Sequence, residues 1–334
     1  MLISVIIPAY NMEKSIVRCL DSIYVQKNPE IEVVVINDGS TDKTKEIVER
    51  YIAEHDDLKI ILKNITNGGL ANARNVGREL SSGKYFIQLD ADDFLKAGIM
   101  NSIIQKINET DFDICFYGFE DYVEDEHIFN NFYHEKFEYI EDASGEEAAI
   151  FKMSRKIWIC QGSACYRREL CEINNIRNIK GVNQGEDFYF ITNMLLVSKK
   201  VTSIPHIGVS ISFRNDSMMH ANFNLTHLQI FEALDSLKKD IMQYQYLKNK
   251  QLLLDYINIE YENNRLNIAK KIIFSPEYKG IGKKISKIKE HVPANEPVNK
   301  SLMSKSKRIE SYLFNHTVYL YYFVSKMYEW FRRN

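Results

Sequence analysis

Polar side chains follow three apolar, strand-like runs near the start of the chain. The runs 4–7, 33–36 and 85–89 lead into Pro8-Ala9-Tyr10-Asn11, Asn37-Asp38-Gly39-Ser40 and Asp90-Ala91-Asp92-Asp93. Because ligands of open α/β sheets bind in the crevice outside the carboxyl ends of the strands, we expect one edge to gather these side chains. Their types suit the base, the sugar and the diphosphate of a sugar nucleotide.

Asp90 and Asp92 stand two residues apart directly after a buried strand. A turn there can direct one or both carboxylates toward a single Mg²⁺ or Mn²⁺ ion, which completes its shell with water and substrate phosphate oxygens. The alternative is that Asp90, Asp92 and Asp93 cap a turn or the following helix.

Asp38 ends the second run, where its carboxylate could accept the imide N–H of a uracil ring while Tyr10 stacks on that base. The same segment, Asp-Gly followed by Ser-Thr-Asp, is also typical of a turn before a helix, and both interpretations can hold together. Asn67-Gly68-Gly69 precedes a helix that carries Arg74, a cation that could meet a phosphate. A surface ion pair is the alternative for Arg74.

Glu186 and Asp187 precede the aromatic run 188–190. Asp187 is the candidate base that takes a proton from an attacking hydroxyl, although acidic residues also favour the first turn of a helix. Arg214, Ser217 and His220 belong to a stretch that could close over a diphosphate or complete a metal shell, while a single histidine is more often an ordinary surface or core residue.

The elements that must position these groups alternate between strand and helix. Apolar residues recur at helical spacing over 16–23 and 47–52, a short strand follows at 58–62, and a helix over 70–80 precedes the strand that opens at Tyr85. This alternation predicts a parallel sheet covered by helices. The first strand lacks a following GxGxxG, which argues against a nicotinamide dehydrogenase. We expect two domains, 1–220 with the site and 221–334 mainly helical.

Composition narrows the class of partner. The 334 residues include 43 Lys and Arg against 45 Asp and Glu, so no bulk attraction to nucleic acid is expected. Five cysteines without CxxC spacing, a start at Met1 without a signal-like segment, and no apolar run of about 20 residues predict a cytoplasmic protein with reduced thiols.

The tail is both basic and aromatic. Lys300, Lys305, Lys307 and Arg308 precede nine aromatic residues between 312 and 331. An interfacial helix would suit peripheral contact with the inner face of the cell membrane, where a lipid-linked acceptor lies. The alternative is a helix packed on its own domain or on a partner in a homodimer.

The strings SVIIPAYN, VVVINDGSTDKT, NGGLANARNVG, LDADD and GEDFYF, in this order, resemble the inverting family-2 glycosyltransferases. The resemblance covers roughly residues 2–220. It implies an α/β fold of the GT-A (Rossmann-like) type, a mostly parallel sheet flanked by helices, here with a C-terminal helical extension.

The resemblance also implies roles for particular residues. Those that hold the nucleoside or lie beside it are Pro8, Ala9, Tyr10, Glu13, Asp38, Asn67 and Arg74. Asp90-Ala91-Asp92 matches the DXD motif, with Asp92 as the main metal ligand and Asp90 toward the ribose or the metal; Glu186 and Asp187 match the ED motif, with Asp187 as the base. Arg214 and Ser217 match a YR-x-x-S segment in which this chain has Phe213 in place of the frequent Tyr.

The implied reaction is a single displacement from a sugar nucleotide, with UDP-sugar as the expected donor, Mn²⁺ or Mg²⁺ as cofactor, and a glycan or lipid-linked acceptor of bacterial surface polysaccharide such as capsule or wall glycan. A sugar nucleotidyltransferase would instead favour a glycine-rich, basic loop after the first strand, which is missing. A non-catalytic sugar-nucleotide-binding or scaffold protein should lack the metal pair or the base, and candidates for both are present.

Overall fold

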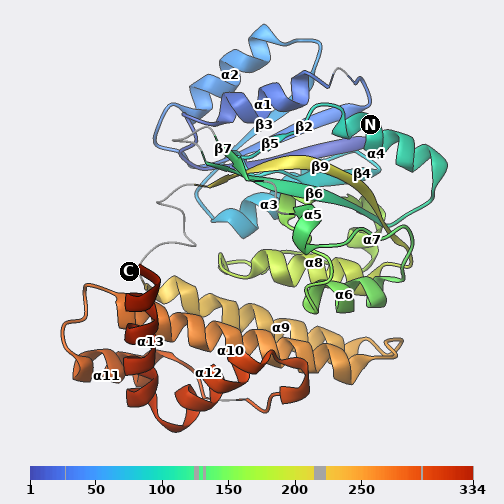
Figure 1. The fold of residues 1–334 in the computed structure, drawn as a ribbon. Helices are drawn as coiled ribbons and strands as arrows, with labels where there is room; N and C mark the ends of the chain where they lie inside the picture. The colour runs from blue at the N-terminus through green and yellow to red at the C-terminus, as the bar shows by residue number, and fades with distance from the viewer. Residues whose placement is uncertain (27, 124–127, 131–132, 214–222, 295, 334) are drawn as a thin grey trace. The chain divides into compact units, whose positions relative to one another are not determined.

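The structure is a computed structural model that describes residues 1–26, 28–123, 128–130, 133–213, 223–294 and 296–333 (Figure 1). The chain divides into two compact units, Met1–Asn215 and Asp216–Asn334. The domain boundary predicted after residue 220 falls within 214–222, outside the described residues.

The first unit contains a nine-stranded sheet in the order β3-β2-β1-β4-β8-β6-β9-β5, with β7 paired to β6. Its strands are β1 Ile3–Ala9, β2 Ile31–Asp38, β3 Lys59–Ile65, β4 Tyr85–Gln88, β5 Phe94–Leu95, β6 Ile114–Val123, β7 Ile128–Asn130, β8 Ala164–Arg167 and β9 Val201–Phe213. The run from β3 to β4 is parallel, and antiparallel pairs begin where β8 joins β4. The parallel half therefore brings the carboxyl ends of β1, β2 and β4 to one edge, as predicted.

Helices cover both faces of this sheet: α1 and α2 lie on one side, and α3 and α8 on the other (Figure 1). The helices are α1 Ile16–Tyr24, α2 Thr44–Glu54, α3 Leu70–Leu80, α4 Ile99–Glu109, α5 Tyr133–Lys136, α6 Gly145–Met153, α7 Arg168–Ile173 and α8 Glu186–Val197, with a 3₁₀ turn η1 at Gln161–Ser163. The predicted helix over 70–80 is confirmed as α3.

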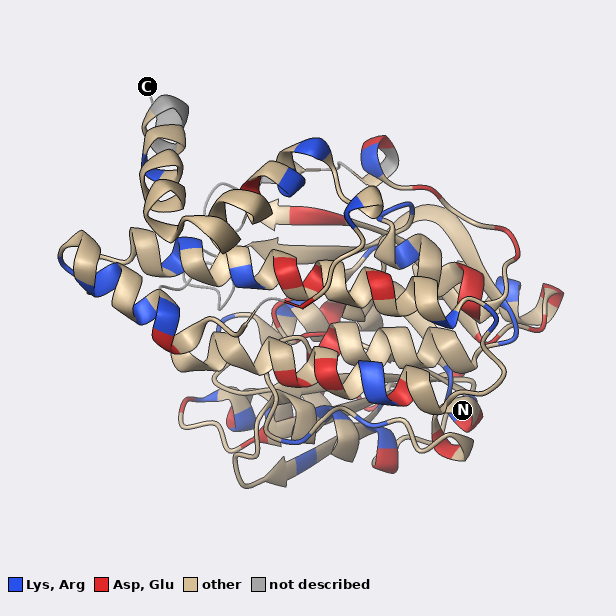
Figure 2. Cartoon of the chain, turned by 90° about the horizontal axis from the view of Figure 1, so that it is seen from below, with Lys and Arg blue, Asp and Glu red and all other residues tan. Residues whose placement is uncertain are grey.

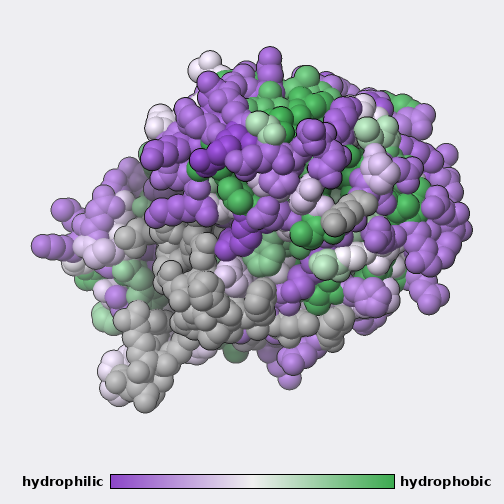
Figure 3. All heavy atoms as spheres, turned by 90° about the horizontal axis from the view of Figure 1, so that it is seen from above, coloured by the Kyte–Doolittle hydropathy of each residue, from purple (hydrophilic) through white to green (hydrophobic). Residues whose placement is uncertain are grey.

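Close packing of α3 on the sheet depends on Gly77. A Cβ at this position would lie 2.2 Å from the side chain of Ile6 on β1, so only glycine allows this approach. On the opposite face α1 buries Ile16, Cys19, Leu20 and Ile23. Figure 3, which looks onto the side of α1 and α2, shows hydrophilic atoms interrupted by small apolar patches, as expected of helices whose apolar stripe faces the sheet.

The second unit is helical, as predicted for 221–334. It contains η2 Leu225–Leu228, α9 Gln229–Gln243, α10 Lys250–Phe274, α11 Ile281–His291, η3 Lys300–Leu302, α12 Lys305–His316 and α13 Val318–Arg333. The long helix α10 contacts α9, α11 and α12, and therefore forms the centre of the unit. Among the described residues, no helix has the length and apolar character needed to cross a bilayer.

Candidate active site

The loops after β1 and β2 brace one another. The amide of Glu13 donates to Asp42 Oδ2 (3.0 Å), the amide of Lys43 donates to Glu13 Oε2 (3.1 Å), and the amide of Asn11 donates to Ser40 Oγ (3.0 Å). Glu13, expected near the nucleoside, thus ties the two loops together. These hydrogen bonds between the two loops fix the edge at the carboxyl ends of β1 and β2 before any ligand binds.

Pro8 and Ala9 form the end of β1, where Ala9 pairs in parallel register with Asn37, and both are buried. Ala91, in the turn after β4, is also buried. Tyr10 follows Ala9 and exposes 46% of its surface, so its ring is accessible to a planar ligand. The structure thus places an accessible aromatic ring directly after β1, which suits the predicted base stacking.

Asp38 is only 3% exposed and organises the neighbouring loop. Its two carboxylate oxygens accept hydrogen bonds from the amides of Gly68 (2.8 Å) and Gly69 (2.9 Å). Gly39 adopts φ +71°, and a Cβ there would lie 2.8 Å from the amide nitrogen of Asn67. The prediction that Asp38 also accepts a uracil imide remains a prediction, and each carboxylate oxygen still has a second lone pair for it.

Arg74 lies at the centre of the site with 1% of its surface exposed. Its Nη2 donates to Asp90 Oδ1 at 2.6 Å, and its Nη1 pairs with Glu186 Oε1. Burial disfavours the charged guanidinium, but the carboxylates of Asp90 and Glu186 outweigh this and raise the pKa of Arg74. The ion pair left open for Arg74 therefore exists, but it is buried rather than at the surface.

Glu186 and Asp187 open helix α8, which follows Gly185 in the left-handed conformation (φ 80°). Burial and the adjacent Asp187 carboxylate raise the pKa of Glu186 to about 7, against the opposing effect of Arg74. Asp187 is partly buried, and its Oδ1 accepts the Phe188 amide at 2.6 Å. Acidic residues at a helix start and a carboxylate titrating near neutral pH thus occur together here.

The turn after β4 is held by residues that the sequence patterns did not indicate. The Asp92 carbonyl accepts from Arg18 Nη2 (2.9 Å) and from Ser212 Oγ, and Asp93 Oδ1 accepts the Ser212 amide at 2.8 Å. Burial, followed by the charges of Asp92 and Asp90, raises the pKa of Asp93 well above its usual value. Asp93 therefore anchors the turn to β9, and the main chain of Asp92 is fixed from two sides.

A second group of residues that the sequence patterns did not indicate lies on β4 and on the elements beside it, η1, β8 and α8. Gln161 Nε2 donates to Gln88 Oε1 at 3.0 Å, and Tyr166 packs between Phe86 (5.4 Å between ring centroids) and Phe190 (5.7 Å). Among the described residues, Gln88 Nε2, Gln161 Oε1 and Tyr166 Oη are buried without a hydrogen-bond partner. Gln88 inside the apolar run 85–89 was the one signal available in the sequence.

The donor set fits a hard divalent cation only as part of a complex with substrate. Within the described part of the chain, no three His, Cys, Asp or Glu side chains form a metal site. Asp90 is partly exposed and already paired with Arg74, while Asp92 is half-buried in the same turn. One or two carboxylates plus diphosphate oxygens are an ordinary Mg²⁺ or Mn²⁺ environment. Arg214, Ser217 and His220 lie outside the described residues.

Comparisons with known proteins point to one enzyme family. Residues 4–172 match the sequence family "Glycosyl transferase family 2". Glycosyltransferase GlyG of Streptococcus pneumoniae is 26% identical over 67% of this chain and 75% of its own length. GlyA of the same organism is 37% identical over 40% of this chain, and EpsJ of Bacillus subtilis is 35% identical over 35% of it. The matched parts make up only 20% of GlyA and 34% of EpsJ.

Among solved structures, residues 1–349 of S. aureus TarS, in complex with UDP-GlcNAc, superpose with a TM-score of 0.73 at 22% identity, over 98% of this chain and 92% of that one. A mannosyltransferase from Pyrobaculum calidifontis, in complex with GDP-Man and Mn²⁺, gives a TM-score of 0.57 at 17% identity over 97% and 85% of the two chains. The predicted fold class is thereby confirmed. The chain belongs to glycosyl transferase family 2, and it is a glycosyltransferase with the GT-A fold.

Proposed function

We propose that this enzyme is an inverting, metal-dependent hexosyltransferase that moves a sugar from a UDP-sugar to a hydroxyl of a glycan or lipid-linked acceptor of a bacterial surface polysaccharide. One observation carries the proposal: Arg74 joins Asp90, on the expected donor side, to Glu186, the neighbour of the expected base. The two halves of the proposed displacement reaction would thus share one charge cluster around the buried Arg74.

The proposed roles follow from this arrangement. Tyr10 stacks on the base, and Asp38 reads it while shaping the loop that carries Asn67. Asp92, with Asp90, would hold Mn²⁺ or Mg²⁺, which supplies charge neutralisation of the departing diphosphate. Asp187 takes the proton of the acceptor hydroxyl as that oxygen attacks the anomeric carbon from the face opposite the leaving group, so the configuration inverts.

The donor and the polymer class rest on neighbours. TarS is known in complexes with UDP and with UDP-GlcNAc. A teichoic acid poly(glycerol phosphate) polymerase of Staphylococcus epidermidis is 35% identical over 33% of this chain, which covers 15% of that polymerase. These support a UDP-sugar and a cell-surface polymer.

We further propose that α13 provides peripheral contact with the inner face of the cell membrane. Phe323, Met327 and Trp330, at helical spacing, are 60%, 56% and 60% exposed, while Tyr321 is buried against the unit. Exposed aromatic side chains near basic residues suit the headgroup region. The double variant Phe323→Ser and Trp330→Ser should no longer float with anionic vesicles. If the variant still floats but no longer forms a dimer that the wild type forms, this face binds a second copy of the chain instead.

The test of the reaction is UDP release from a panel of UDP- and GDP-sugars, with and without Mn²⁺. The wild type, Asp187→Asn and the matched control Asp56→Asn, an exposed acid of the same unit, are compared. Metal-dependent release from one donor, lost only in Asp187→Asn, supports the proposal. Full turnover by Asp187→Asn would show that Asp187 is not the base. Binding of UDP without turnover of any donor favours the alternative of a binding protein.

A further inference from the structure

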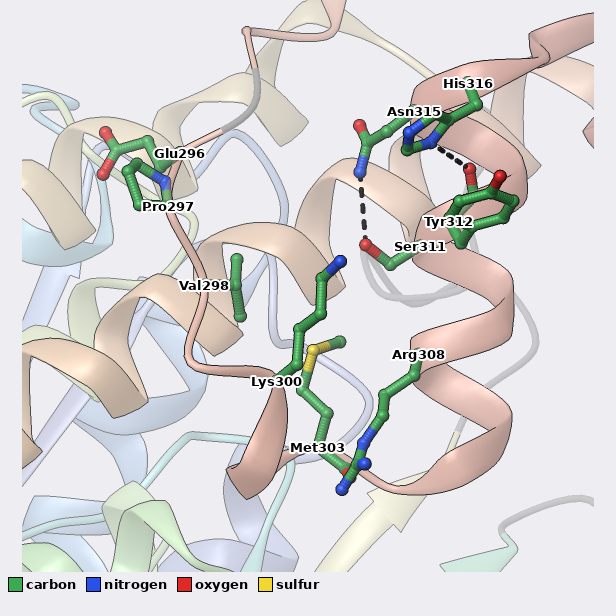
Figure 4. A pocket seen from close by; sticks show the side chains of 10 residues that line it. All are labelled: Glu296, Pro297, Val298, Lys300, Met303, Arg308, Ser311, Tyr312, Asn315 and His316. Carbon is green, nitrogen blue, oxygen red and sulfur yellow. Dashed lines mark hydrogen bonds between the residues drawn. The ribbon is translucent and has the colours of Figure 1, made fainter.

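The second unit contains a cavity of about 220 Å³ between the segment 296–300 and helix α12 (Figure 4). Its walls come from η3, from the start of α12 and from the last turn of that helix. The volume is below the ~300–1,000 Å³ of pockets for drug-sized ligands, so the cavity suits a group about the size of one sugar ring.

An exposed aromatic ring forms one wall of the cavity. Tyr312 exposes 56% of its surface and stacks on His316, with 4.1 Å between ring centroids. The Nδ1 atom of His316 also lies 2.9 Å from the Tyr312 carbonyl, which fixes the ring pair on the helix. A rigid ring that is apolar on its face and wet at its edge can pack against the C–H face of a saccharide.

Two cations line the same cavity. Among the described residues, neither Lys300 nor Arg308 forms an ion pair with an acidic side chain. Arg308 donates from Nε to the Met303 carbonyl (2.9 Å) and from Nη2 to the Ser301 carbonyl (3.3 Å), which leaves further N–H groups for a ligand. Figure 4 shows Lys300 extending from η3 into the space beside α12.

The polar wall of the cavity is rigid. Ser311 Oγ (2.5 Å) and Asn315 Nδ2 (2.9 Å) both donate to Glu262 Oε1, and Arg265 Nη1 donates to Asn315 Oδ1 at 2.9 Å. Glu262 is 1% exposed and pairs with Arg265, so a buried ion pair on α10 holds two side chains of the cavity in place.

The charge of the second unit favours an anion. Residues 216–334 contain 19 Lys and Arg against 12 Asp and Glu, and Figure 2 shows Lys and Arg spread over several of its helices. The acid at the cavity, Glu296, already pairs with Lys238. Lys300 and Arg308 are therefore lining cations that no acidic side chain pairs with among the described residues, and an anionic ligand gains from them.

We propose that this cavity binds one anionic saccharide unit, a sugar that bears a phosphate or a carboxylate, belonging to the acceptor glycan. Tyr312 packs on the ring, and Lys300 and Arg308 bind the anionic group. The assignment to the acceptor rests on the proposed function, because a polymer that is extended at the active site would present its previously added sugars elsewhere on the enzyme.

The test is titration calorimetry of the full chain with glucose 6-phosphate, with glucose and inorganic phosphate as comparators. Saturating UDP and Mn²⁺ are present to fill the catalytic site. The variants are Lys300→Gln with Arg308→Gln, and Tyr312→Leu. The matched control is Lys283→Gln with Lys305→Gln, two exposed cations outside the cavity lining. Circular dichroism verifies that each variant is folded.

Glucose 6-phosphate should bind with a Kd of about 1 mM, and both cavity variants should weaken it about tenfold while the control does not. Equal binding by the wild type and the Lys300/Arg308 variant overturns the proposal. Inorganic phosphate binding as tightly as the sugar phosphate, insensitive to Tyr312→Leu, overturns the saccharide in favour of a bare anion site.

Binding of anionic-lipid vesicles through Lys300 and Arg308, without sugar phosphate binding, overturns it in favour of a membrane surface. Loss of donor turnover in Asp187→Asn is independent of all these outcomes, so failure of the cavity proposal and failure of the proposed reaction remain distinguishable.

Discussion

A buried glutamate lies beside a cation at each end of the parallel strands, and the pKa values of the two glutamates are shifted in opposite directions. At the amino end, Glu32 is 0% exposed and accepts hydrogen bonds from Ser4 Oγ (2.7 Å), the Ser82 amide (2.6 Å) and Lys59 Nζ (2.5 Å). Burial alone would raise its pKa, but these hydrogen bonds lower it to about 2.

At the carboxyl end, Glu186 shares its cation. Arg74 divides its guanidinium between Glu186 and Asp90, and the Asp187 carboxylate lies beside them, so burial and repulsion raise the pKa of Glu186 to about 7. The amino-end cluster, in which both carboxylate oxygens of Glu32 accept hydrogen bonds, stabilises the fold. The carboxyl-end cluster carries surplus negative charge, and perturbed carboxylates of this kind are concentrated at functional sites.

The largest expected effect is at the carboxyl end. Asp92→Asn keeps the shape of the turn, because Arg18 and Ser212 hold the main chain of residue 92, but it removes the proposed metal carboxylate. We expect metal-dependent UDP release to fall at least about hundredfold, with the thermal unfolding midpoint unchanged. A variant that keeps its Mn²⁺ dependence and rate would remove Asp92 from the site.

Replacing Arg74 tests how the two carboxylates are held. Lysine has a single ammonium and cannot bridge Asp90 and Glu186 as the guanidinium fork does. We expect Arg74→Lys to lower kcat about tenfold at pH 7, and to shift the acid limb of the pH profile upward because Glu186 loses part of its counter-charge.

Arg78→Lys is the matched control for that variant. Arg78 lies one turn further along α3, is also buried, and donates to neutral partners, Asn178 Oδ1 (2.8 Å) and Asn75 Oδ1. Burial lowers its pKa to about 10. An equal shift of the pH profile in both variants would mean that general loss of packing, and not the carboxylate bridge, is responsible.

A smaller effect is expected at the loop 67–69, which Asp38 holds in place. Asp38→Asn replaces one of the two oxygens that accept the Gly68 and Gly69 amides with a donor, so the loop with Asn67 loses its fixed position. UDP affinity, measured by calorimetry, should fall about tenfold, while Asp56→Asn leaves it unchanged. Wild-type affinity in Asp38→Asn would show that neither the loop nor the base requires this carboxylate.

The sequence predicted the strands β1, β2 and β4 to within two residues of their carboxyl ends, the helix over 70–80 and the edge where the polar groups meet, because these depend on local periodicity. It could not predict how the groups pair. Arg74 and Glu186 are 112 residues apart, and Arg18 and Ser212 are 194 apart, so their contacts exist only once the sheet has formed. The surface ion pair considered for Arg74 followed from its helix position alone, which does not reveal the adjoining helix α8.

The most direct test compares Glu32→Gln with Glu186→Gln by denaturant unfolding across pH, together with UDP release. Ionised Glu32 stabilises the fold above its ordinary pKa of 4.5, and this stabilisation is lost as the pH falls through about 2. Glu186 binds its proton more tightly in the folded state, so the stability it contributes at low pH is lost as the pH rises from 4.5 through about 7.

At pH 8 we predict that Glu32→Gln loses about 1–3 kcal/mol of unfolding free energy, because its partner Lys59 is nearly half exposed and water can solvate it, and keeps UDP release per folded molecule. Glu186→Gln should retain wild-type stability or gain some, and should lose UDP release. If instead Glu186→Gln is destabilised as much as Glu32→Gln and still releases UDP, the carboxyl-end cluster is structural and has no role in the reaction.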